Sequence, residues 1–332
     1  MGRIRWAVLA IALASGVAQA ASAGWNPKLA AAYLDQRQRE WFAWPAAAKA
    51  GGPCVSCHTG LPYLIVRPAL RRALGESAPT EWETGLRAAL RARLDDGIAE
   101  AAAKSQAIGT ESIFAALFLP GEAAARDRLW KLQLKDGPAR GGWNWYTLER
   151  DPWENAEAPF FGAALAALAV KDAPAADRDR VRPLIEYLKR AAAAQPLQNR
   201  LAVLWTAPGA GKREWIEEAF SKQAGDGGWT AASIGPWKAR AEAPPSAGSD
   251  SYATAFVAFA LLEAGVKPGD ARMARALGWL RSHQDAKAGY WDAVSMNKRY
   301  EPGSMPDLFM RDAATGFAAA ALLKAEEAGE AR

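Results

Sequence analysis

The chain has 332 residues, of which 50% are hydrophobic and 23% charged, and its formal net charge is +5. Its two Cys are too few for a disulfide framework, and its two His are too few for a His-rich metal centre built by the protein alone. Lys and Arg are interspersed with Asp and Glu, so no basic stripe indicates a nucleic-acid partner. Fifteen Trp are far above ordinary usage and call for an architectural explanation.

Residues 1–20 have the three parts of a secretory signal peptide. Arg3 and Arg5 make a positive start, residues 6–17 are apolar, and Ala18-Gln19-Ala20 is an A-x-A cleavage site, with a second such site at 21–23. A membrane span needs about 20 apolar residues, which neither this stretch nor any later one supplies. We therefore expect residues 21–332 to be one exported, periplasmic domain without a membrane span. An uncleaved anchor is the alternative.

Residues 54–58 read Cys-Val-Ser-Cys-His, which is the attachment pattern of haem c. Two thiols form thioethers with the haem vinyl groups, and the adjacent His becomes the proximal iron ligand. We therefore predict one covalent haem bound by Cys54, Cys57 and His58. A redox C-x-x-C pair, half a zinc site and a structural disulfide are the alternatives. A redox pair would want a βαβ setting, which is absent, and a zinc site lacks ligands because His283 is the only other His.

Helical periodicity predicts twelve helices and almost no strands. Polar-faced helices are expected at 27–43, 80–94, 121–134, 177–193, 211–223 and 269–284. Ala-rich, more apolar helices are expected at 58–72, 109–119, 158–170, 197–207, 249–265 and 308–326. Because the two kinds alternate strictly, we expect an all-α fold in which six outer and six inner helices close into an (α/α)6 toroid. An open solenoid or a bundle is the alternative.

The haem motif directly precedes the first apolar helix, so we expect it at the inner rim of the ring. Residues 51–53 (Gly-Gly-Pro) would form the loop that presents it. Thr59 is a candidate helix cap, and Pro68 is expected to kink or end the helix.

Three segments share a Gln, a Gly-containing turn and a Trp. They are Gln133 with Gly141-Gly142-Trp143, Gln223 with Gly227-Gly228-Trp229, and Gln284 with Gly289-Tyr290-Trp291. Gly permits the tight turn, the Gln side chain can bond to backbone groups left open at helix ends, and the Trp can stack over the turn. Each unit needs neighbours to bury its face.

These units resemble the QW repeats of squalene–hopene and oxidosqualene cyclases and the related repeats of protein prenyltransferase β subunits. The segments that begin at Asp250 and Asp312 resemble the D-x-x-T-A inner helices of that family. The resemblance covers residues 129–143 and 215–326 and implies the toroid. It does not imply the chemistry, because the Asp-x-Asp-Asp acid of the cyclases is absent, and Tyr252 stands where zinc prenyltransferases have Cys. At residues 54–58 alone, the chain resembles a c-type cytochrome.

The distal ligand of the iron is not evident from the sequence. His283, at a helix end, and Met273, at core spacing, have simpler structural explanations, and Met296 lies in a long polar connection. In a closed ring, residues 292–311 return near His58, which makes Met305 or Met310 the preferred distal ligand. The alternatives are that these Met pack the seam of the ring and that the iron has an open position.

Other polar residues precede or begin inner helices and are expected near the same rim. They are Glu111, Glu154, Asn155, Glu157, Asp250, Arg311 and Asp312. Asp250 and Asp312 are expected to cap helices or pair with Arg. Trp143, Trp145 and Trp153 are expected to stack within the repeats, with an aromatic haem pocket as the alternative. Residues 231–248 form a loop that is either a lid or a surface connection.

The haem favours electron transfer or haem-based redox chemistry, with a periplasmic redox partner or a small apolar molecule as the counterpart. Whether the protein is an enzyme stays open, since this depends on the sixth ligand. The alternative function is binding of a lipid or isoprenoid, or haem-based sensing, without turnover.

Overall fold

The computed structural model describes residues 24–49, 51–94, 105–244 and 248–330, and the protein is all-α over these ranges. The expected signal peptide at residues 1–20 lies outside them. Two strands of two residues each, Ala48–Lys49 (β1) and Gly52–Pro53 (β2), pair in antiparallel fashion and make the one sheet of the described chain.

Twelve α-helices account for most of the described chain. Those expected to be polar-faced are α1 (Pro27–Ala43), α3 (Glu81–Ala92), α5 (Ala123–Lys131), α7 (Arg178–Ala191), α9 (Arg213–Ser221) and α11 (Ala271–Ser282). Those expected to be apolar are α2 (Gly60–Ala73), α4 (Gln106–Phe118), α6 (Ala158–Ala169), α8 (Leu197–Thr206), α10 (Ser251–Glu263) and α12 (Phe309–Glu330). All twelve expected helices are therefore confirmed, with ends that differ by a few residues.

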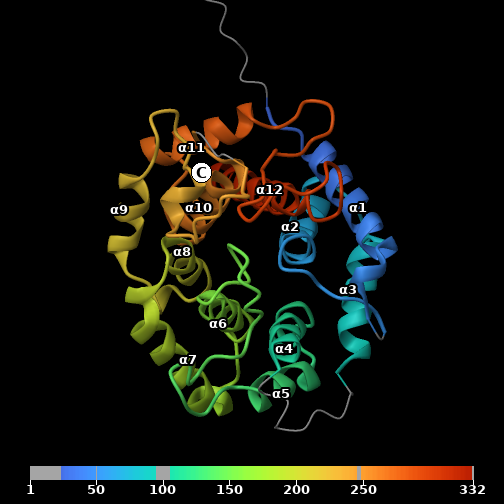
Figure 1. Ribbon diagram of the computed structural model, residues 1–332, viewed down its shortest axis with the longest axis vertical. Helices are drawn as coiled ribbons and strands as arrows, with labels where there is room; N and C mark the ends of the chain where they lie inside the picture. Colours follow the sequence, from blue (N-terminus) through green and yellow to red (C-terminus); the bar gives the residue numbers. More distant parts are fainter. Residues whose placement is uncertain (1–23, 50, 95–104, 245–247, 331–332) are drawn as a thin grey trace, which may run out of the picture.

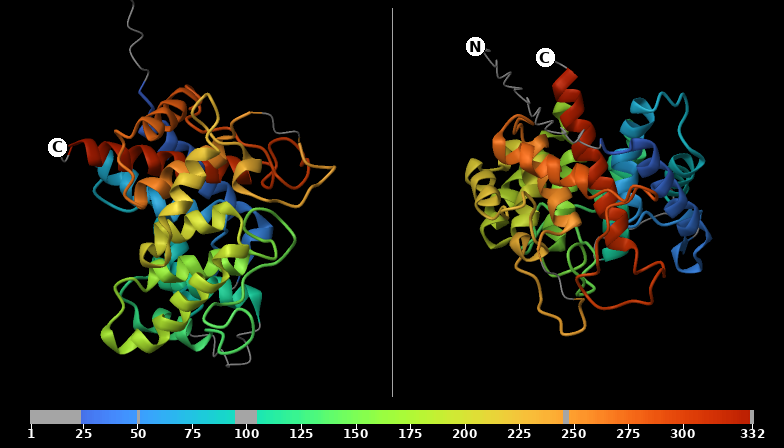
Figure 2. Two further views of the ribbon diagram at one scale, coloured as in Figure 1. Left: turned by 90° about the vertical axis from the view of Figure 1, so that its left-hand side faces the viewer. Right: turned by 90° about the horizontal axis from the view of Figure 1, so that it is seen from above.

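The helices form two layers. In Figure 1, the odd-numbered helices lie on the outside and the even-numbered helices lie within them, so that the chain alternates between the layers. The inner helix α12 packs against both α10 and α2, which brings the last inner helix beside the first. Figure 2 shows that α12, the longest helix, extends beyond its neighbours.

The three repeat Gln residues make equivalent hydrogen bonds. Each donates from Nε2 to the carbonyl of a turn glycine in its own unit, at 2.8–3.0 Å, and to a backbone carbonyl at the start of the next outer helix. The second acceptors are the carbonyls of Arg180 in α7, Arg272 in α11 and Asn26 before α1. The last of these bonds joins the end of α11 to the beginning of α1. The Gln side chains thus bond to backbone groups near helix ends, as expected, but their acceptors are carbonyls of the turn and of the next helix start and are not the groups a helix end leaves open.

The three repeat Trp residues also make equivalent hydrogen bonds. Trp143, Trp229 and Trp291 are fully buried and donate from Nε1 to the carbonyls of Leu129, Ala219 and Leu280, over 2.6–2.7 Å. Each bond ties a turn to the outer helix that precedes it. The turn glycines Gly141, Gly227 and Gly289 have φ of +94°, +98° and +80°, a conformation that favours Gly.

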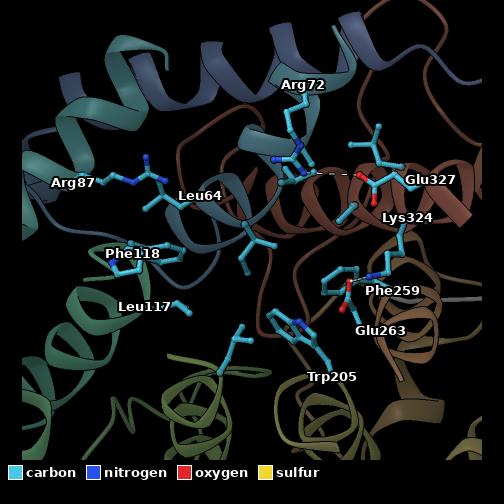
Figure 3. A pocket seen from close by; sticks show the side chains of 17 residues that line it. Leu64, Arg72, Arg87, Leu117, Phe118, Trp205, Phe259, Glu263, Lys324 and Glu327 are labelled. Atoms are coloured by element: carbon cyan, nitrogen blue, oxygen red, sulfur yellow. Dashed lines mark ion pairs between the residues drawn. The ribbon is translucent and has the colours of Figure 1, made fainter. Parts of the chain in front are cut away.

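A cavity of about 420 Å³ lies among the C-terminal halves of the six inner helices, all of which contribute to its wall (Figure 3). The haem motif lies at the opposite, N-terminal ends of these helices, since His58 precedes α2 and packs against Phe309 at the start of α12. Within the described ranges, no helix combines the length and the apolar character that a membrane crossing requires.

Candidate functional site

The backbone of the 54–58 segment is held on both sides. The β1–β2 hairpin leads into it, and the Cys54 amide donates to the Ala47 carbonyl at 3.0 Å. The indole Nε1 of Trp41 donates to the Cys54 carbonyl at 2.8 Å. The Ser56 hydroxyl accepts from the amides of Thr59 and Gly60, at 3.1 and 2.9 Å, and so caps the first turn of α2.

These contacts correct the expectation that Thr59 caps α2, and the bounds of α2 exclude one of the two outcomes expected of Pro68. The Thr59 side chain makes no capping bond to the helix, because Ser56 occupies that role and the Thr59 hydroxyl bonds to Asp312 instead. The helix also continues through Pro68 to Ala73. Pro68 therefore does not end it.

Both cysteines are free thiols in a buried setting. Cys57 is 3% exposed, and Cys54 is half-buried. Burial raises the pKa of both thiols, and for Cys57 the nearby carboxylate of Glu154 adds to the effect. A redox-active C-x-x-C pair has a lowered thiol pKa, so this environment does not favour thiol–disulfide exchange.

The two thiols and His58 line one cavity of about 490 Å³. Its wall also includes Trp41, Phe114 and Tyr146, which supply flat apolar surface. The cations Lys49 and Arg93 lie on the same wall. Because a haem is a large flat apolar ring with two carboxylates, the residues present fit this group. The described residues contain no cluster of three or more His, Cys, Asp or Glu that could hold a metal ion by itself.

The His58 ring is fixed by aromatic neighbours. It stacks on Phe309, with ring centroids 3.5 Å apart, and meets the edge of Trp41 at 6.1 Å. Burial, together with the positive charges of Arg150 and Arg37, lowers the pKa of His58 to about 3. The imidazole is therefore neutral near pH 7, which is the form that binds a metal.

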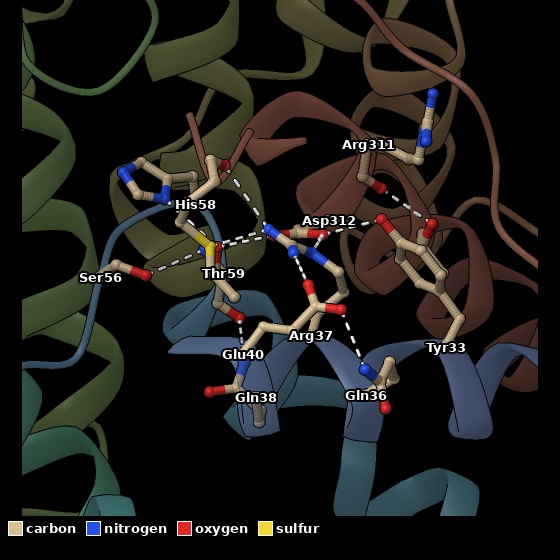
Figure 4. A network of polar contacts seen from close by, with 12 residues as sticks. Tyr33, Gln36, Arg37, Gln38, Glu40, Ser56, His58, Thr59, Arg311 and Asp312 are labelled. Atoms are coloured by element: carbon tan, nitrogen blue, oxygen red, sulfur yellow. Dashed lines mark hydrogen bonds and ion pairs between the residues drawn. The ribbon is translucent and has the colours of Figure 1, made fainter. Parts of the chain in front are cut away.

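A buried polar network lies behind His58 (Figure 4). The Asp312 carboxylate, fully buried, accepts from Tyr33 Oη at 2.8 Å, from Arg37 Nε at 2.7 Å and from the Thr59 hydroxyl at 2.7 Å. The Thr59 hydroxyl is 3.4 Å from His58 Nδ1. The network joins α1, α12 and the residue before α2, so it holds the first and last helices of the described chain together next to the 54–58 segment.

A second cavity, of about 260 Å³, adjoins the first, since both include His58 and Glu154 in their walls. Met310 lines this second cavity, and its neighbours there include Trp44, Trp153 and Phe309. Met305 lies elsewhere in the network, where its sulfur accepts a hydrogen bond from Arg37 Nη2 at 2.9 Å. Of the two candidate distal ligands, Met310 is thus the one that shares a cavity with His58.

Glu154 lies between the two cavities. Its side chain forms no hydrogen bond or ion pair with the described residues, and burial raises its pKa while Arg150 opposes the shift. Glu111 lines the first cavity and is paired with Arg93 and Arg128. The expectation that these two carboxylates lie near the haem motif is confirmed.

The other expected rim residues have structural roles. Asp250 caps α10 by accepting from the Ala253 amide at 2.8 Å, as expected. Asn155 bonds to Asp151, and Arg311 pairs with Asp292. Glu157 is exposed and makes no side-chain cap.

The other aromatic residues singled out in the sequence lie partly in the core and partly in the wall of the site. Trp143 and Trp145 are fully buried in the core, whereas Trp153 lines the second cavity. His283 ends α11 and stacks on Trp279 at 3.7 Å, and Met273 is fully buried. In the 231–248 segment, residues 245–247 lie outside the described ranges.

Sequence reasoning did not single out Phe309, Trp41, Trp44 or Tyr146. Phe309 precedes Met310 at the start of a helix, and Tyr146 follows a buried Trp, so neither position carries a local signal. Their place beside the haem motif follows from the way α1, α12 and the 141–157 segment converge on it.

No protein-family model matches the chain, and no curated protein was found to match it.

Proposed function

We propose that this chain is an exported, periplasmic c-type haem protein built on an (α/α)6 toroid like that of the terpenoid cyclases, and that it acts in electron transfer or haem-based redox chemistry. The observation that carries the proposal is the convergence of both free thiols and His58 on one cavity of about 490 Å³. The alternation of outer and inner helices, and the equivalent Gln and Trp bonds of the three repeats, support the toroid.

In this proposal Cys54 and Cys57 hold the haem covalently, and His58 is the proximal ligand. A bound haem supplies a one-electron couple at the iron. The chain contributes the rest: Phe309 and Trp41 fix the imidazole, and the Thr59–Asp312 contact lies on its Nδ1 side. Trp41, Phe114 and Tyr146 supply apolar surface for the ring, and the cation of Lys49 lies on the same wall, where it can face the haem carboxylates.

The test is expression with the cytochrome c maturation machinery, followed by pyridine haemochrome spectra of the denatured protein. The wild type is expected to keep its haem through denaturation, and Cys54→Ser or Cys57→Ser to give the shifted spectrum of a single thioether. The double variant is expected to lose the haem. A wild-type protein without covalent haem would overturn the proposal.

Spectra of the oxidised and reduced holoprotein, with and without CO, test how the haem is used. Low-spin iron that does not bind CO supports an electron carrier, and Met310→Leu is then expected to open the iron to CO, with Met296→Leu as the matched control. High-spin iron that binds CO in the wild type supports an enzyme or a sensor and rejects Met310 as the ligand.

A second role, binding of an apolar molecule without turnover, is favoured by the cavity at the other end of the inner helices. Most of its wall is apolar, and it is separate from the haem motif.

A further inference from the structure

Among the described residues that line the cavity at the C-terminal halves of the inner helices, one cation, Arg87, has no ion-pair partner. Its wall is mainly aliphatic and aromatic, with side chains such as Leu64, Leu117, Phe118, Trp205 and Phe259. Its volume of about 420 Å³ falls in the range of small-molecule sites, ~300–1,000 Å³. Small-molecule sites of this kind pair an apolar wall with a few polar groups that fix the orientation of the ligand.

Most charged groups in the wall are already paired with each other. Lys324 Nζ lies 3.0 Å from Glu263 Oε1, and Arg72 Nη2 lies 3.9 Å from Glu327 Oε1. Figure 3 shows both pairs at the α12 side of the cavity. Both carboxylates that the described part of the chain contributes to the wall are thus paired, so a cationic ligand finds no free counter-charge among them.

Arg87 is different. It comes from the outer helix α3, which packs against both α2 and α4, and extends toward Leu64 and Phe118 (Figure 3). Its Nε is buried without a hydrogen-bond partner, and its guanidinium makes no ion pair with the described residues. A buried donor without a partner is costly, at about 1–3 kcal/mol, so a guanidinium in this state beside an apolar cavity points to an acceptor supplied from outside the chain.

We infer that this cavity binds an amphipathic carboxylate with a single alkyl chain, of the fatty-acid class, with the carboxylate on Arg87 and the chain along the apolar wall. One guanidinium matches one carboxylate through two parallel N–H···O bonds. A head group with more negative charge would need further free cations, and Lys324 and Arg72 are occupied. The inference rests on the second role proposed above and is independent of the haem.

Titration calorimetry of the matured full-length protein with dodecanoate and with dodecanol tests it. Dodecanoate is expected to bind more tightly than dodecanol, and each methylene added from octanoate to dodecanoate to tighten binding about fourfold. Arg87→Gln is expected to weaken dodecanoate about 10- to 100-fold and to leave dodecanol unchanged. Arg87→Lys is expected to keep part of the affinity.

Two further variants make the test specific. Arg72→Gln, the matched control, removes a cation that is already paired and 66% exposed, and should change dodecanoate affinity by about threefold or less. Ala320→Phe fills the cavity from α12 and should abolish binding of both ligands. Circular dichroism confirms that each variant is folded.

Equal affinity for dodecanoate and dodecanol, or equal losses in Arg87→Gln and Arg72→Gln, would overturn the inference. The haem spectrum separates this result from the main proposal. If the protein lacks covalent haem but still binds dodecanoate through Arg87, the haem proposal is wrong and the carboxylate site stands. If the haem-loaded protein binds no dodecanoate, the carboxylate site is wrong and the haem proposal stands.

Discussion

Replacement of Asp312 by Ala is the sharpest test of how α12 is held against α1. The carboxylate accepts hydrogen bonds from Tyr33, Arg37 and Thr59, and the Arg37 side chain is only 3% exposed. Removal of one partner of a buried ion pair typically costs about 3–5 kcal/mol, because the other charge is left without compensation. Glu40, 40% exposed, still contacts Arg37, so we expect a loss near 3 kcal/mol.

Urea unfolding of the wild type and the variants measures this loss. Asp312→Asn keeps the shape and an acceptor and should lose less than Asp312→Ala. In a double-mutant cycle, Arg37→Met should recover part of the stability lost in Asp312→Ala, because no buried charge remains. Glu217→Ala, which breaks an exposed pair with Arg272, is the matched control and should cost below about 0.5 kcal/mol. A loss below about 1 kcal/mol for Asp312→Ala, or strict additivity in the cycle, would refute the reasoning.

Three further predictions concern the repeats and one helix cap. Trp229→Ala should lower the free energy of unfolding by about 3–5 kcal/mol, because the indole is fully buried and bonded to the Ala219 carbonyl. Trp237 is half-buried, so Trp237→Ala should lower it less. Equal losses in the two variants would contradict the role of Trp229 in the repeat. Gln284→Ala should lower the free energy of unfolding by about 1–2 kcal/mol, because it removes the side-chain hydrogen bonds that join the end of α11 to the start of α1. The control Gln36→Ala, at an exposed position, should lower it by under about 0.5 kcal/mol, and urea unfolding measures both losses. Burial raises the pKa of Asp250 from 3.8 to about 6, so between these values the folded state binds a proton that the unfolded state has released, and stability falls as pH rises through this window, by at most about 3 kcal/mol. Asp250→Asn keeps the cap and should remove this part of the pH dependence, and identical pH profiles of the two proteins would show that the shift is absent.

The local features of the fold were predictable because their causes are local. The alternation of polar-faced and Ala-rich segments predicts twelve helices, and all twelve are present. The Gln-Gly-Trp pattern predicts a bonded turn because Gly allows the positive φ and the Gln side chain is long enough to reach the backbone of the turn. The return of residues 292–311 to His58 was also predicted, from the expectation of a closed ring, and Phe309 from this segment stacks on His58.

At α2, the cap was predicted wrongly, and the helix did not end at Pro68, because contacts from distant parts of the chain act there. Thr59 precedes the helix and has the composition of a cap, but the Asp312 carboxylate, from the far end of the chain, accepts its hydroxyl, and Ser56 takes over the cap. Pro68 removes one backbone donor from the helix, but the packing of α2 against α12 and α1 holds the helix through it. In both cases tertiary contacts outweigh the local preference.

The sequence by itself determined the helices, the repeat turns and the position of the Cys-x-x-Cys-His segment before an inner helix, because periodicity, Gly conformation and residue spacing are properties of neighbouring residues. Only the tertiary structure decided which groups face one another. It placed Asp312 on Arg37 across 275 residues and Phe309 on His58. Within the described ranges, it left the Nε of Arg87 without a hydrogen-bond partner in the wall of an apolar cavity. These relations depend on how helices distant in the chain pack, and no local pattern encodes them.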